Sequence, residues 1–320
     1  KLFGCGCVLQ QLMDFGKLPS INHVHFALPA DPPDNAHVLA AVNQQDNDPL
    51  SVYVGCTGWG MKEWVGSIYP PKTQAKDYLK HYARQFNTIE HNTTHYRIPD
   101  AATVQKWYAD AAPDFRFCPK IPQTISHSRD LGMSGNQIVQ FCDAIELLQE
   151  KLGACFLQLP PYFGPDRLGQ LDAFLQQFPR SIPLAVELRH EDWFGQEDHR
   201  QRLFDLLERR HTGAVITDVA GRRDVLHMHV TSYFAMVRFV GNDLHPTDFS
   251  RLEDWAERIL HWQSLGLKEI WFFTHEPDNL RAPEAAAYLV SLLQNKTGIT
   301  TRGPQLNGLP DEAEGQLSLF

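Results

Sequence analysis

Short apolar runs rich in β-branched and aromatic residues recur along the chain, separated by stretches with a helical hydrophobic period. The runs lie at residues 52–56, 88–92, 115–120, 154–159, 184–189, 214–218, 235–239 and 269–274. The helical stretches lie at residues 73–86, 100–107, 137–152, 167–178, 200–210, 248–264 and 283–294. Each run predicts a strand and each stretch a helix, whereas residues 219–234 lack a helical period and predict that the sixth helix is absent.

This alternation predicts one α/β domain at residues 51–296, a (β/α)8 TIM barrel whose strand–helix units take roughly 220 residues. The alternative is an open, doubly wound parallel sheet, which usually carries a glycine-rich phosphate loop after its first strand. The sequence Gly55-Cys56-Thr57-Gly58-Trp59 lacks that spacing, and the Trp59 ring would crowd a phosphate. The pattern therefore favours the barrel.

The two ends of the chain differ from the barrel pattern. Residues 1–50 are predicted to form an N-terminal extension, with a weak strand pattern at residues 21–27 and a polar stretch up to Asp48. Residues 297–315 are rich in Gly, Thr, Pro and acidic side chains and lack an apolar period. They predict a flexible linker, which is followed by a short apolar peptide at residues 316–320.

Polar side chains end seven of the eight predicted strands, on the same parity as apolar residues expected to point inward, such as Phe156, Ile216, Met236 and Phe273. In chain order they are Glu90 and Asn92, Lys120, Gln158, Glu187 and Arg189, Asp218, Arg238, and His275. The carboxyl ends of barrel strands meet at one mouth, where barrel enzymes have their active sites. We therefore expect one shared pocket, although some of these groups could be buried ion pairs that only satisfy each other.

The residue types at this mouth suit catalysis and the binding of a sugar or another planar group. We assign catalytic roles to the ionisable groups Glu90, Lys120, Glu187, His190 and Asp218. We assign substrate binding to other polar groups and to aromatic rings, namely Trp59, Asn92, Tyr96, Gln158, Arg189, Trp193, Arg238 and His275.

Two mechanisms fit these groups. Carboxylates and histidines could bind a divalent metal ion that activates water. Alternatively, a glutamate with a raised pKa and a neighbouring lysine or histidine could perform metal-free acid–base catalysis. The surplus of cationic side chains would repel a metal ion and weakens the first mechanism, but the sequence leaves both open.

Composition limits the partners and the compartment. The formal net charge is −9 and the sequence pI is about 5.9, which argues against a wide basic surface for nucleic acid but allows a local basic groove. No apolar run is long enough to span a membrane, and the first residues lack the apolar core of a signal peptide. Because the six cysteines are scattered, we expect a reduced, cytoplasmic protein.

The chain resembles the domain-of-unknown-function family seventy-two in many of the residues named above, among them Trp59, Glu90 and Arg238. Further matching pieces are Tyr69-Pro70, Trp107, Lys151-Leu152-Gly153, Gln158-Leu159-Pro160-Pro161 and Val186-Glu187-Leu188-Arg189-His190. The resemblance covers about residues 52–290. It implies a (β/α)8 barrel but no particular reaction.

The chain departs from the family pattern at two strand ends. Val240 stands where members usually carry the histidine of an Arg-x-His-Gly motif after strand seven. Thr274 and His275 replace the two asparagines of the Phe-Asn-Asn with which strand eight usually ends. These departures leave open whether the chemistry of the family is altered or lost here. More distantly, the chain resembles barrels of the endonuclease IV and xylose isomerase kind, which use carboxylate–histidine metal sites.

The last five residues resemble the pentapeptide with which bacterial DNA polymerases and repair proteins bind the sliding clamp. They are Gln316, Leu317, Ser318, Leu319 and Phe320. Two apolar anchors suit a hydrophobic pocket, and a tether raises the local concentration of a weakly binding peptide. We therefore expect the clamp as a partner, and a hydrolase or lyase of DNA metabolism as the function. The alternatives are a non-catalytic clamp-binding or ligand-binding protein, and an enzyme that acts on a sugar or sugar phosphate.

Overall fold

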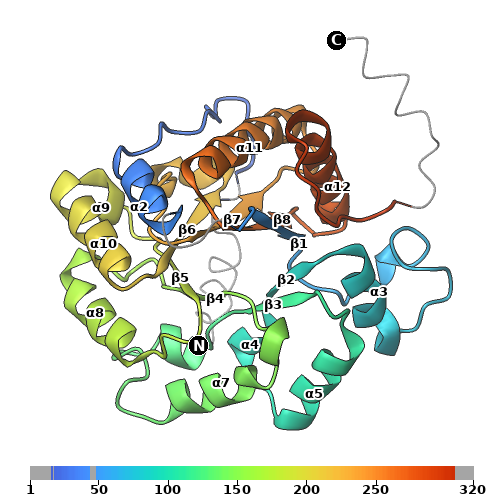
Figure 1. The fold of residues 1–320 in the computed structure, drawn as a ribbon, viewed down its shortest axis with the longest axis horizontal. Coiled ribbons are helices and arrows are strands. Elements are labelled where there is room, and N and C mark those ends of the chain that lie inside the picture. Colours follow the sequence, from blue (N-terminus) through green and yellow to red (C-terminus); the bar gives the residue numbers. More distant parts are fainter. Residues whose placement is uncertain (1–15, 17, 44–47, 307–320) are drawn as a thin grey trace, which may run out of the picture.

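Eight parallel strands stand in chain order around a central axis, and the helices lie outside them (Figure 1). The computed structural model describes residues 16, 18–43 and 48–306. The strands are β1 (Ser51–Gly55), β2 (Thr88–His91), β3 (Arg116–Pro119), β4 (Cys155–Gln158), β5 (Leu184–Glu187), β6 (Gly213–Asp218), β7 (Phe234–Val240) and β8 (Glu269–His275). Each begins and ends within two residues of its predicted run, so the (β/α)8 prediction is confirmed.

The ladder of backbone hydrogen bonds is divided into two sheets. Strands β1-β8-β7-β6-β5-β4 form the larger sheet, and β2-β3 form the smaller one. The two sheets adjoin at two seams. At the seam between β1 and β2 the Glu90 amide donates to the Cys56 carbonyl at 3.0 Å, and at the seam between β3 and β4 the Ile121 amide donates to the Phe156 carbonyl at 2.9 Å. These bonds hold the carboxyl ends of neighbouring strands together at both seams.

The helices that follow the strands form the outer layer. The longer ones are α3 (Tyr78–Gln85), α5 (Ala101–Asp110), α7 (Gln137–Glu146), α8 (Leu168–Gln177), α10 (Glu197–Arg209), α11 (Pro246–Leu265) and α12 (Ala282–Leu292). One-turn helices in the loops are α4 (Thr93–Tyr96), α6 (Gln123–Ser126) and α9 (Asp192–Gly195). Asp100 caps α5, because its side chain accepts a hydrogen bond from the Thr103 amide at 2.8 Å.

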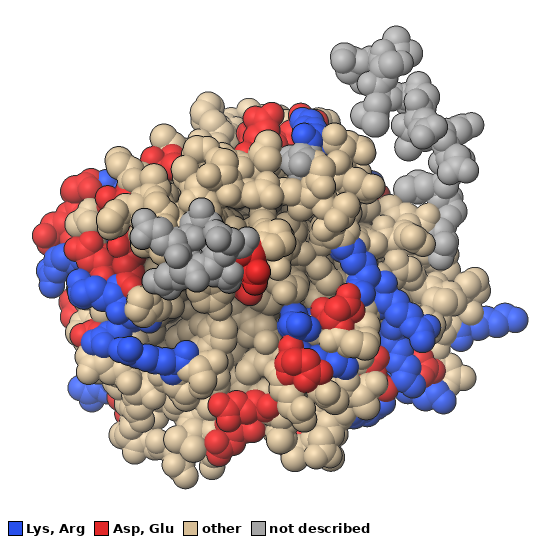
Figure 2. Space-filling view, viewed as in Figure 1, with Lys and Arg blue, Asp and Glu red and all other residues tan. Residues whose placement is uncertain are grey.

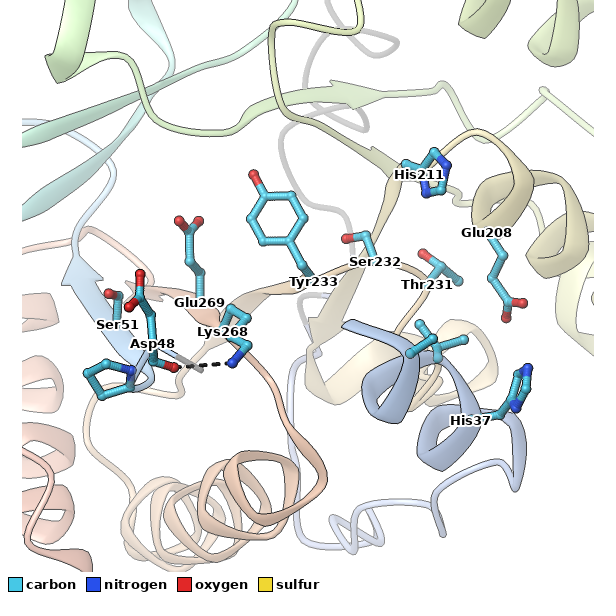
Figure 3. A pocket seen from close by; sticks show the side chains of 13 residues that line it. His37, Asp48, Ser51, Glu208, His211, Thr231, Ser232, Tyr233, Lys268 and Glu269 are labelled. Carbon is cyan, nitrogen blue, oxygen red and sulfur yellow. Dashed lines mark hydrogen bonds between the residues drawn. The ribbon is translucent and has the colours of Figure 1, made fainter. Parts of the chain in front are cut away.

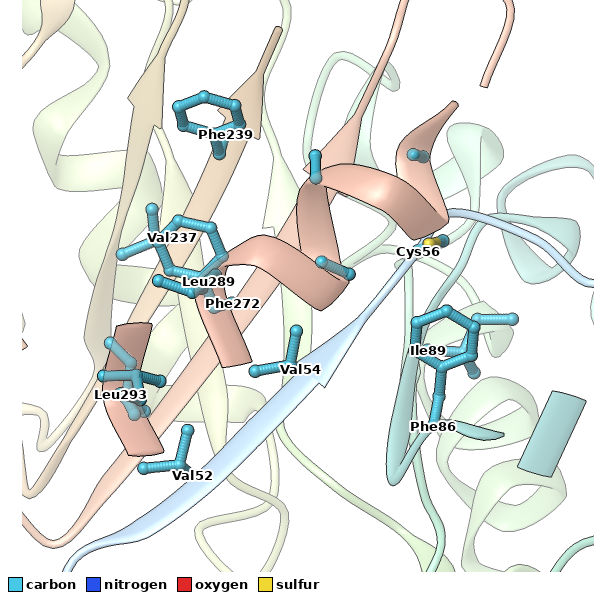
Figure 4. Close-up of a cluster of buried hydrophobic side chains, with 14 of the residues drawn as sticks. Val52, Val54, Cys56, Phe86, Ile89, Val237, Phe239, Phe272, Leu289 and Leu293 are labelled. Atoms are coloured by element: carbon cyan, nitrogen blue, oxygen red, sulfur yellow. The ribbon is translucent and has the colours of Figure 1, made fainter. Parts of the chain in front are cut away.

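Apolar side chains fill two layers, one inside the barrel and one between strands and helices. Inside, Phe156, Met236, Trp271 and Phe273 pack together, so the predicted inward parity of three of these residues is confirmed. The outer layer packs β1, β7 and β8 against α12 (Figure 4). Its members include Val52, Val54, Val237, Phe272, Leu289 and Leu293. Burial on both faces explains why these strands read as continuous apolar runs.

The sixth helix is absent, as predicted, and the N-terminal extension fills its place. A 3₁₀ segment, Ala220–Val225, follows β6 where an α-helix would stand. Helix α2 (Asp34–Asn43) of the extension lies beside α10 and α11 at this position (Figure 1). The buried Asn35 side chain donates to the Met228 carbonyl at 2.7 Å and accepts from the Val230 amide at 2.9 Å. The extension therefore completes the outer layer.

In the described residues, the structure differs from two predictions for the ends of the chain. Residues 21–27 form turns and irregular backbone rather than a strand. The first part of the predicted linker is docked on the barrel. There Thr301 donates to the Val52 carbonyl at 2.6 Å, and Arg302 forms an ion pair with Asp114 at 2.8 Å. Residues 307–320, which contain the predicted clamp-binding peptide, lie outside the described residues.

Surface charges of both signs are mixed over the face seen in Figure 2. Acidic side chains gather over α9 and α10, whereas Lys and Arg form a band on the side of α3. Of the helices in the described part of the chain, none combines the length and the apolar character needed to cross a membrane. The four described cysteines, Cys56, Cys118, Cys142 and Cys155, are buried free thiols that pack as small apolar side chains.

Candidate active site

A cavity of about 450 Å³ opens at the carboxyl ends of the strands, where the sequence analysis expects the site. Seven of the residues assigned to the site line it, namely Asn92, Tyr96, Lys120, Gln158, Arg189, Arg238 and His275. Further polar lining comes from Thr57, His95, Gln123, His127, Thr217 and Asn279. The structure thus brings together side chains from strands that are far apart in the sequence.

Arg238 of β7 is the centre of a buried ion-pair network beneath this cavity. Its Nε and Nη2 atoms donate to the two carboxylate oxygens of Glu90 at 2.9 and 3.0 Å, and its Nη1 atom donates to Glu187 at 2.9 Å. Both glutamates are almost fully buried. The shared guanidinium therefore offsets the cost of burying two negative charges, and its planar fork suits two carboxylates better than an ammonium would.

Glu187, the last residue of β5, has two more partners. Gln158 donates to it at 2.7 Å and Arg189 at 2.8 Å. Burial alone would raise the pKa of Glu187, but Arg189 and Arg238 outweigh burial and lower the pKa to about 2. The carboxyl group is therefore ionised at neutral pH and is no proton donor.

Glu90 of β2 has the same character. Asn92 Nδ2 donates to it at 2.9 Å, and His275 Nε2 lies 2.9 Å from its other oxygen. Burial opposes ionisation, but Arg238 and His275 hold the pKa of Glu90 well below its usual range. The expectation of an acid with a raised pKa is therefore wrong for Glu90 and Glu187.

Lys120, directly after β3, faces the cavity with 8% of its surface exposed. Its ammonium lies 5.9 Å from the centroid of the Phe156 ring, and it forms no hydrogen bond or ion pair with any residue that the structure describes. Burial and the neighbouring Arg238 lower the pKa of Lys120 to about 8. About one-tenth of this amine is therefore neutral, and nucleophilic, at pH 7.

Two histidines that the sequence analysis did not assign to the site lie close to Lys120. His95 Nδ1 is 2.9 Å from the Ile121 carbonyl oxygen, and because a carbonyl can only accept, Nδ1 carries the proton. Burial and Lys120 lower the pKa of His95 to about 4, so its Nε2 keeps a lone pair at neutral pH. The His127 ring lies 5.7 Å from the His95 ring, and burial and Lys120 lower the pKa of His127 as well.

The position of Asp218 contradicts its predicted place in the pocket. Its side chain is directed to α11, where it pairs with Arg251 at 3.0 Å and accepts from Trp255 Nε1 at 2.9 Å. Ile216 likewise packs in the outer layer, so the predicted parity of β6 is wrong by one residue. Thr217 lines the cavity instead, and its buried hydroxyl has no hydrogen-bond partner within the described structure. A ligand in the cavity could supply that partner.

Three other predicted residues lie outside the cavity. His190 lines a separate shallow depression beside α9. Trp59 packs edge-on against Trp107, with ring centroids 6.2 Å apart. Trp193 is fully buried and donates its Nε1 hydrogen to the Phe163 carbonyl at 2.7 Å. These tryptophans therefore support the loops around the mouth rather than contact a ligand in the cavity.

The donor set does not fit a divalent metal. Within the described part of the chain, no group of three or more His, Cys, Asp or Glu side chains is arranged to bind a metal ion. Glu90 and Glu187 are already engaged by guanidinium groups, and Lys120, Arg189 and Arg238 would repel a cation. The side chains therefore favour the metal-free alternative.

A second cavity, of about 560 Å³, lies at the opposite end of the barrel, at the amino ends of the strands (Figure 3). The barrel contributes Ser51, Tyr233 and Glu269, and the extension contributes α2 and Asp48. Lys268 Nζ donates to the Asp48 carbonyl at 3.2 Å. No local sequence pattern indicates this cavity, because its walls join segments 220 residues apart.

The whole barrel matches a known family. Residues 53–308 match the sequence model of the family described as "Protein of unknown function DUF72". The chain belongs to this family. Among curated relatives, UPF0759 protein YecE of Escherichia coli (strain K12) is 31% identical over 251 residues, which cover 73% of this chain and 89% of the relative. UPF0759 protein YunF of Bacillus subtilis (strain 168) is 29% identical over 161 residues, which cover 48% of this chain and 55% of the relative.

Solved DUF72 structures share the fold. A DUF72 family protein from Enterococcus faecalis V583 aligns with a TM-score of 0.61 at 20% identity, over 79% of this chain and 98% of that one. Another DUF72 family protein, from Thermotoga maritima MSB8, aligns with a TM-score of 0.60 at 23% identity, over 77% of this chain and 100% of that one. The resemblance noted from the sequence is therefore confirmed. Helix α2 and Asp48 precede residue 53, where the family match begins, so part of the second cavity lies outside the DUF72 match.

Proposed function

We propose that the cavity at the carboxyl ends of the strands is the active site of a metal-independent lyase with Lys120 as its nucleophile. The supporting observation is a buried amine that has a lowered pKa and faces the cavity without a partner among the described residues. Such amines add to aldehydes and ketones. Because Arg189, Arg238 and Lys120 make the lining cationic, the proposed substrate is a sugar-like carbonyl compound that carries a phosphate.

The proposed reaction uses side chains of the cavity. The Lys120 lone pair forms a bond to the carbonyl carbon, and loss of water leaves a protonated imine. His95 Nε2 takes a proton from the adjacent carbon, and the electron pair left behind expels the phosphate from the next carbon. Arg189 stabilises the departing phosphate, and water then hydrolyses the unsaturated imine and regenerates the amine.

The glutamates act as positioning residues in this proposal. Glu187 fixes the Arg189 guanidinium through its 2.8 Å bond, and Glu90 and Glu187 together fix Arg238. Arg238 in turn contributes to the lowered pKa of Lys120. The network thereby keeps the amine reactive without touching the reacting atoms.

The direct test traps the imine on the full-length protein. Incubation with glyceraldehyde 3-phosphate and sodium cyanoborohydride should convert Lys120 to a secondary amine, which peptide mass spectrometry locates. Lys120→Gln should lose the adduct and the release of phosphate. Lys62→Gln, which changes a side chain that is 82% exposed, should keep both. The proposal would be wrong if Lys120→Gln still released phosphate, or if surface lysines were labelled as strongly as Lys120.

We also propose recruitment to the bacterial sliding clamp through residues 316–320, and with it a role in DNA metabolism. The support is their resemblance to the clamp-binding pentapeptide, with Leu319 and Phe320 as the two apolar anchors. Recruitment would favour a substrate in DNA over a free sugar phosphate.

Calorimetry with the purified clamp tests this recruitment. Full-length protein should bind, and deletion of residues 316–320 should abolish binding. Equal binding by the truncated chain would refute the role of the peptide. Clamp binding by a protein that never forms the Lys120 adduct would favour the alternative of a non-catalytic clamp-binding protein.

A further inference from the structure

Two exposed tyrosine rings flank the mouth of the site cavity. Tyr96, in α4 after β2, is 76% exposed and lines the cavity. Tyr162, in the loop after β4, is 62% exposed. Large side chains with an apolar ring usually pack against the protein, so two exposed rings beside one cavity are typical of a binding surface.

A shallow groove of about 510 Å³ lies next to the cavity, and Tyr162 forms part of its lining. It is lined by His127, Ser128, Arg129, Tyr162, Asp166, Arg167 and Gln170. His127 lines both the groove and the site cavity, so the two hollows share a wall. A ligand longer than the cavity could therefore continue into the groove.

The groove presents guanidinium groups suited to anions. Arg167 lies 4.2 Å from the Phe163 ring centroid and donates to the Arg129 carbonyl at 3.0 Å, which holds it in place. Arg129 is exposed, and its guanidinium forms no ion pair or hydrogen bond with the described residues. With one carboxylate, Asp166, in the lining, this groove is locally basic in a chain with a net charge of −9.

We infer that a single-stranded polynucleotide crosses this mouth, with bases stacked on Tyr96 and Tyr162 and phosphates on Arg129 and Arg167. The inference rests on the proposed function, because it names the polymer that would bring a sugar and its phosphate to Lys120. Aromatic platforms beside a basic groove are how proteins bind single strands without sequence preference. A neutral polysaccharide could stack on the same rings, but it would leave the guanidinium groups without an anion.

The test measures fluorescence anisotropy of a labelled dT12 oligonucleotide with the full-length protein. Tyr96→Ala and Tyr162→Ala should each weaken binding at least about fivefold, the lower end expected for loss of one base–ring stack. Affinity falls as the salt concentration rises, and Arg129→Ala should make the slope of log affinity against log salt less negative by about 0.7, as loss of one phosphate contact does. Leu260→Ala and Arg202→Ala, at exposed positions on α11 and α10, should bind as the natural chain does.

The outcomes separate this inference from the proposed function. Absence of dT12 binding, unchanged binding by both tyrosine variants, or displacement of dT12 by maltoheptaose would overturn the polynucleotide surface. If Lys120 still forms its adduct with glyceraldehyde 3-phosphate in that case, the lyase proposal stands alone. If dT12 binds as expected and Lys120 forms no adduct, the surface is supported and the lyase proposal fails.

Discussion

The two ends of the barrel shift the pKa values of their glutamates in opposite directions. At the carboxyl end, guanidinium groups surround Glu90 and Glu187 and keep both ionised. At the amino end, Glu269 accepts a hydrogen bond from Trp271 Nε1 at 3.2 Å, and burial raises its pKa. The carboxyl end therefore combines paired charges with the Lys120 amine, whereas the amino end has a carboxyl group whose pKa is raised by burial.

This difference favours the carboxyl end as the place of the proposed reaction. A network of fixed charges can set the pKa of a neighbouring group, as Arg238 does for Lys120. Among the described residues no arginine lines the amino-end cavity, which is walled partly by residues before the DUF72 match. The proposed reactivity therefore lies at the carboxyl end, where barrel enzymes have their active sites.

The largest expected effect comes from removing the centre of the carboxyl-end network. Arg238→Met leaves Glu90 and Glu187 buried without their shared partner, which should cost about 3–5 kcal/mol of the free energy of unfolding. Urea unfolding followed by circular dichroism measures the loss. Arg202→Met, at a 60% exposed side chain on α10, is the control and should change stability by less than about 0.5 kcal/mol. A loss below about 1 kcal/mol for Arg238→Met would contradict the role of the network.

Neutralising one carboxylate at each end should shift stability in opposite directions. The folded-state pKa of Glu187 is about 2, below its ordinary value of 4.5, so its ionised form contributes about 3 kcal/mol at pH 7. Glu187→Gln should lose this contribution, which the natural chain itself loses as the pH falls from about 4.5 to 2.

Glu269 behaves in the reverse sense, because its folded-state pKa is raised. Its stabilising contribution is present below the unfolded pKa and is lost as the pH rises. Glu269→Gln should therefore stabilise the protein at pH 7, by less than Glu187→Gln destabilises it. Urea unfolding of both variants at pH 3, 5 and 7 measures the change in the free energy of unfolding. Changes of the same sign at pH 7 would contradict the difference between the two ends.

A smaller effect is expected where the extension replaces the sixth helix. Asn35→Ala leaves the Met228 carbonyl and the Val230 amide without their hydrogen-bond partners. It should lower the free energy of unfolding by about 1–3 kcal/mol. Asn22→Ala, at an exposed position, is the control and should cause no measurable loss in the free energy of unfolding. If the two ends are independent, the folded Asn35→Ala protein should still form the Lys120 adduct. Loss of that adduct in the folded variant would show that the ends are coupled.

Much of the site could be predicted from the sequence because polar residues follow apolar strand runs. This holds for Gln158, Arg238 and His275, whose inward parity follows from alternation along β4, β7 and β8. It fails at β6, because two consecutive polar residues, Thr217 and Asp218, end this strand and the pattern does not tell which of them points inward.

The remaining differences arise in loops and in distant contacts. His95 is three residues beyond Asn92, and only the one-turn helix α4 brings it to the cavity. The same kind of turn at α9 takes Trp193 into the core. The docking of α2 depends on a hydrogen bond between residues 195 positions apart, which no local pattern reveals.

The pH dependence of Lys120 modification tests whether this amine has the lowered pKa on which the proposed reaction depends. Limiting acetic anhydride is added at a series of pH values, and mass spectrometry quantifies acetylation of the peptide that contains Lys120. In the folded protein the reactivity should reach half its maximum near pH 8, because burial and Arg238 lower the pKa to about 8. In concentrated urea the same amine should titrate near the ordinary lysine value of about 10.4. A midpoint near that value in the folded protein would contradict the account.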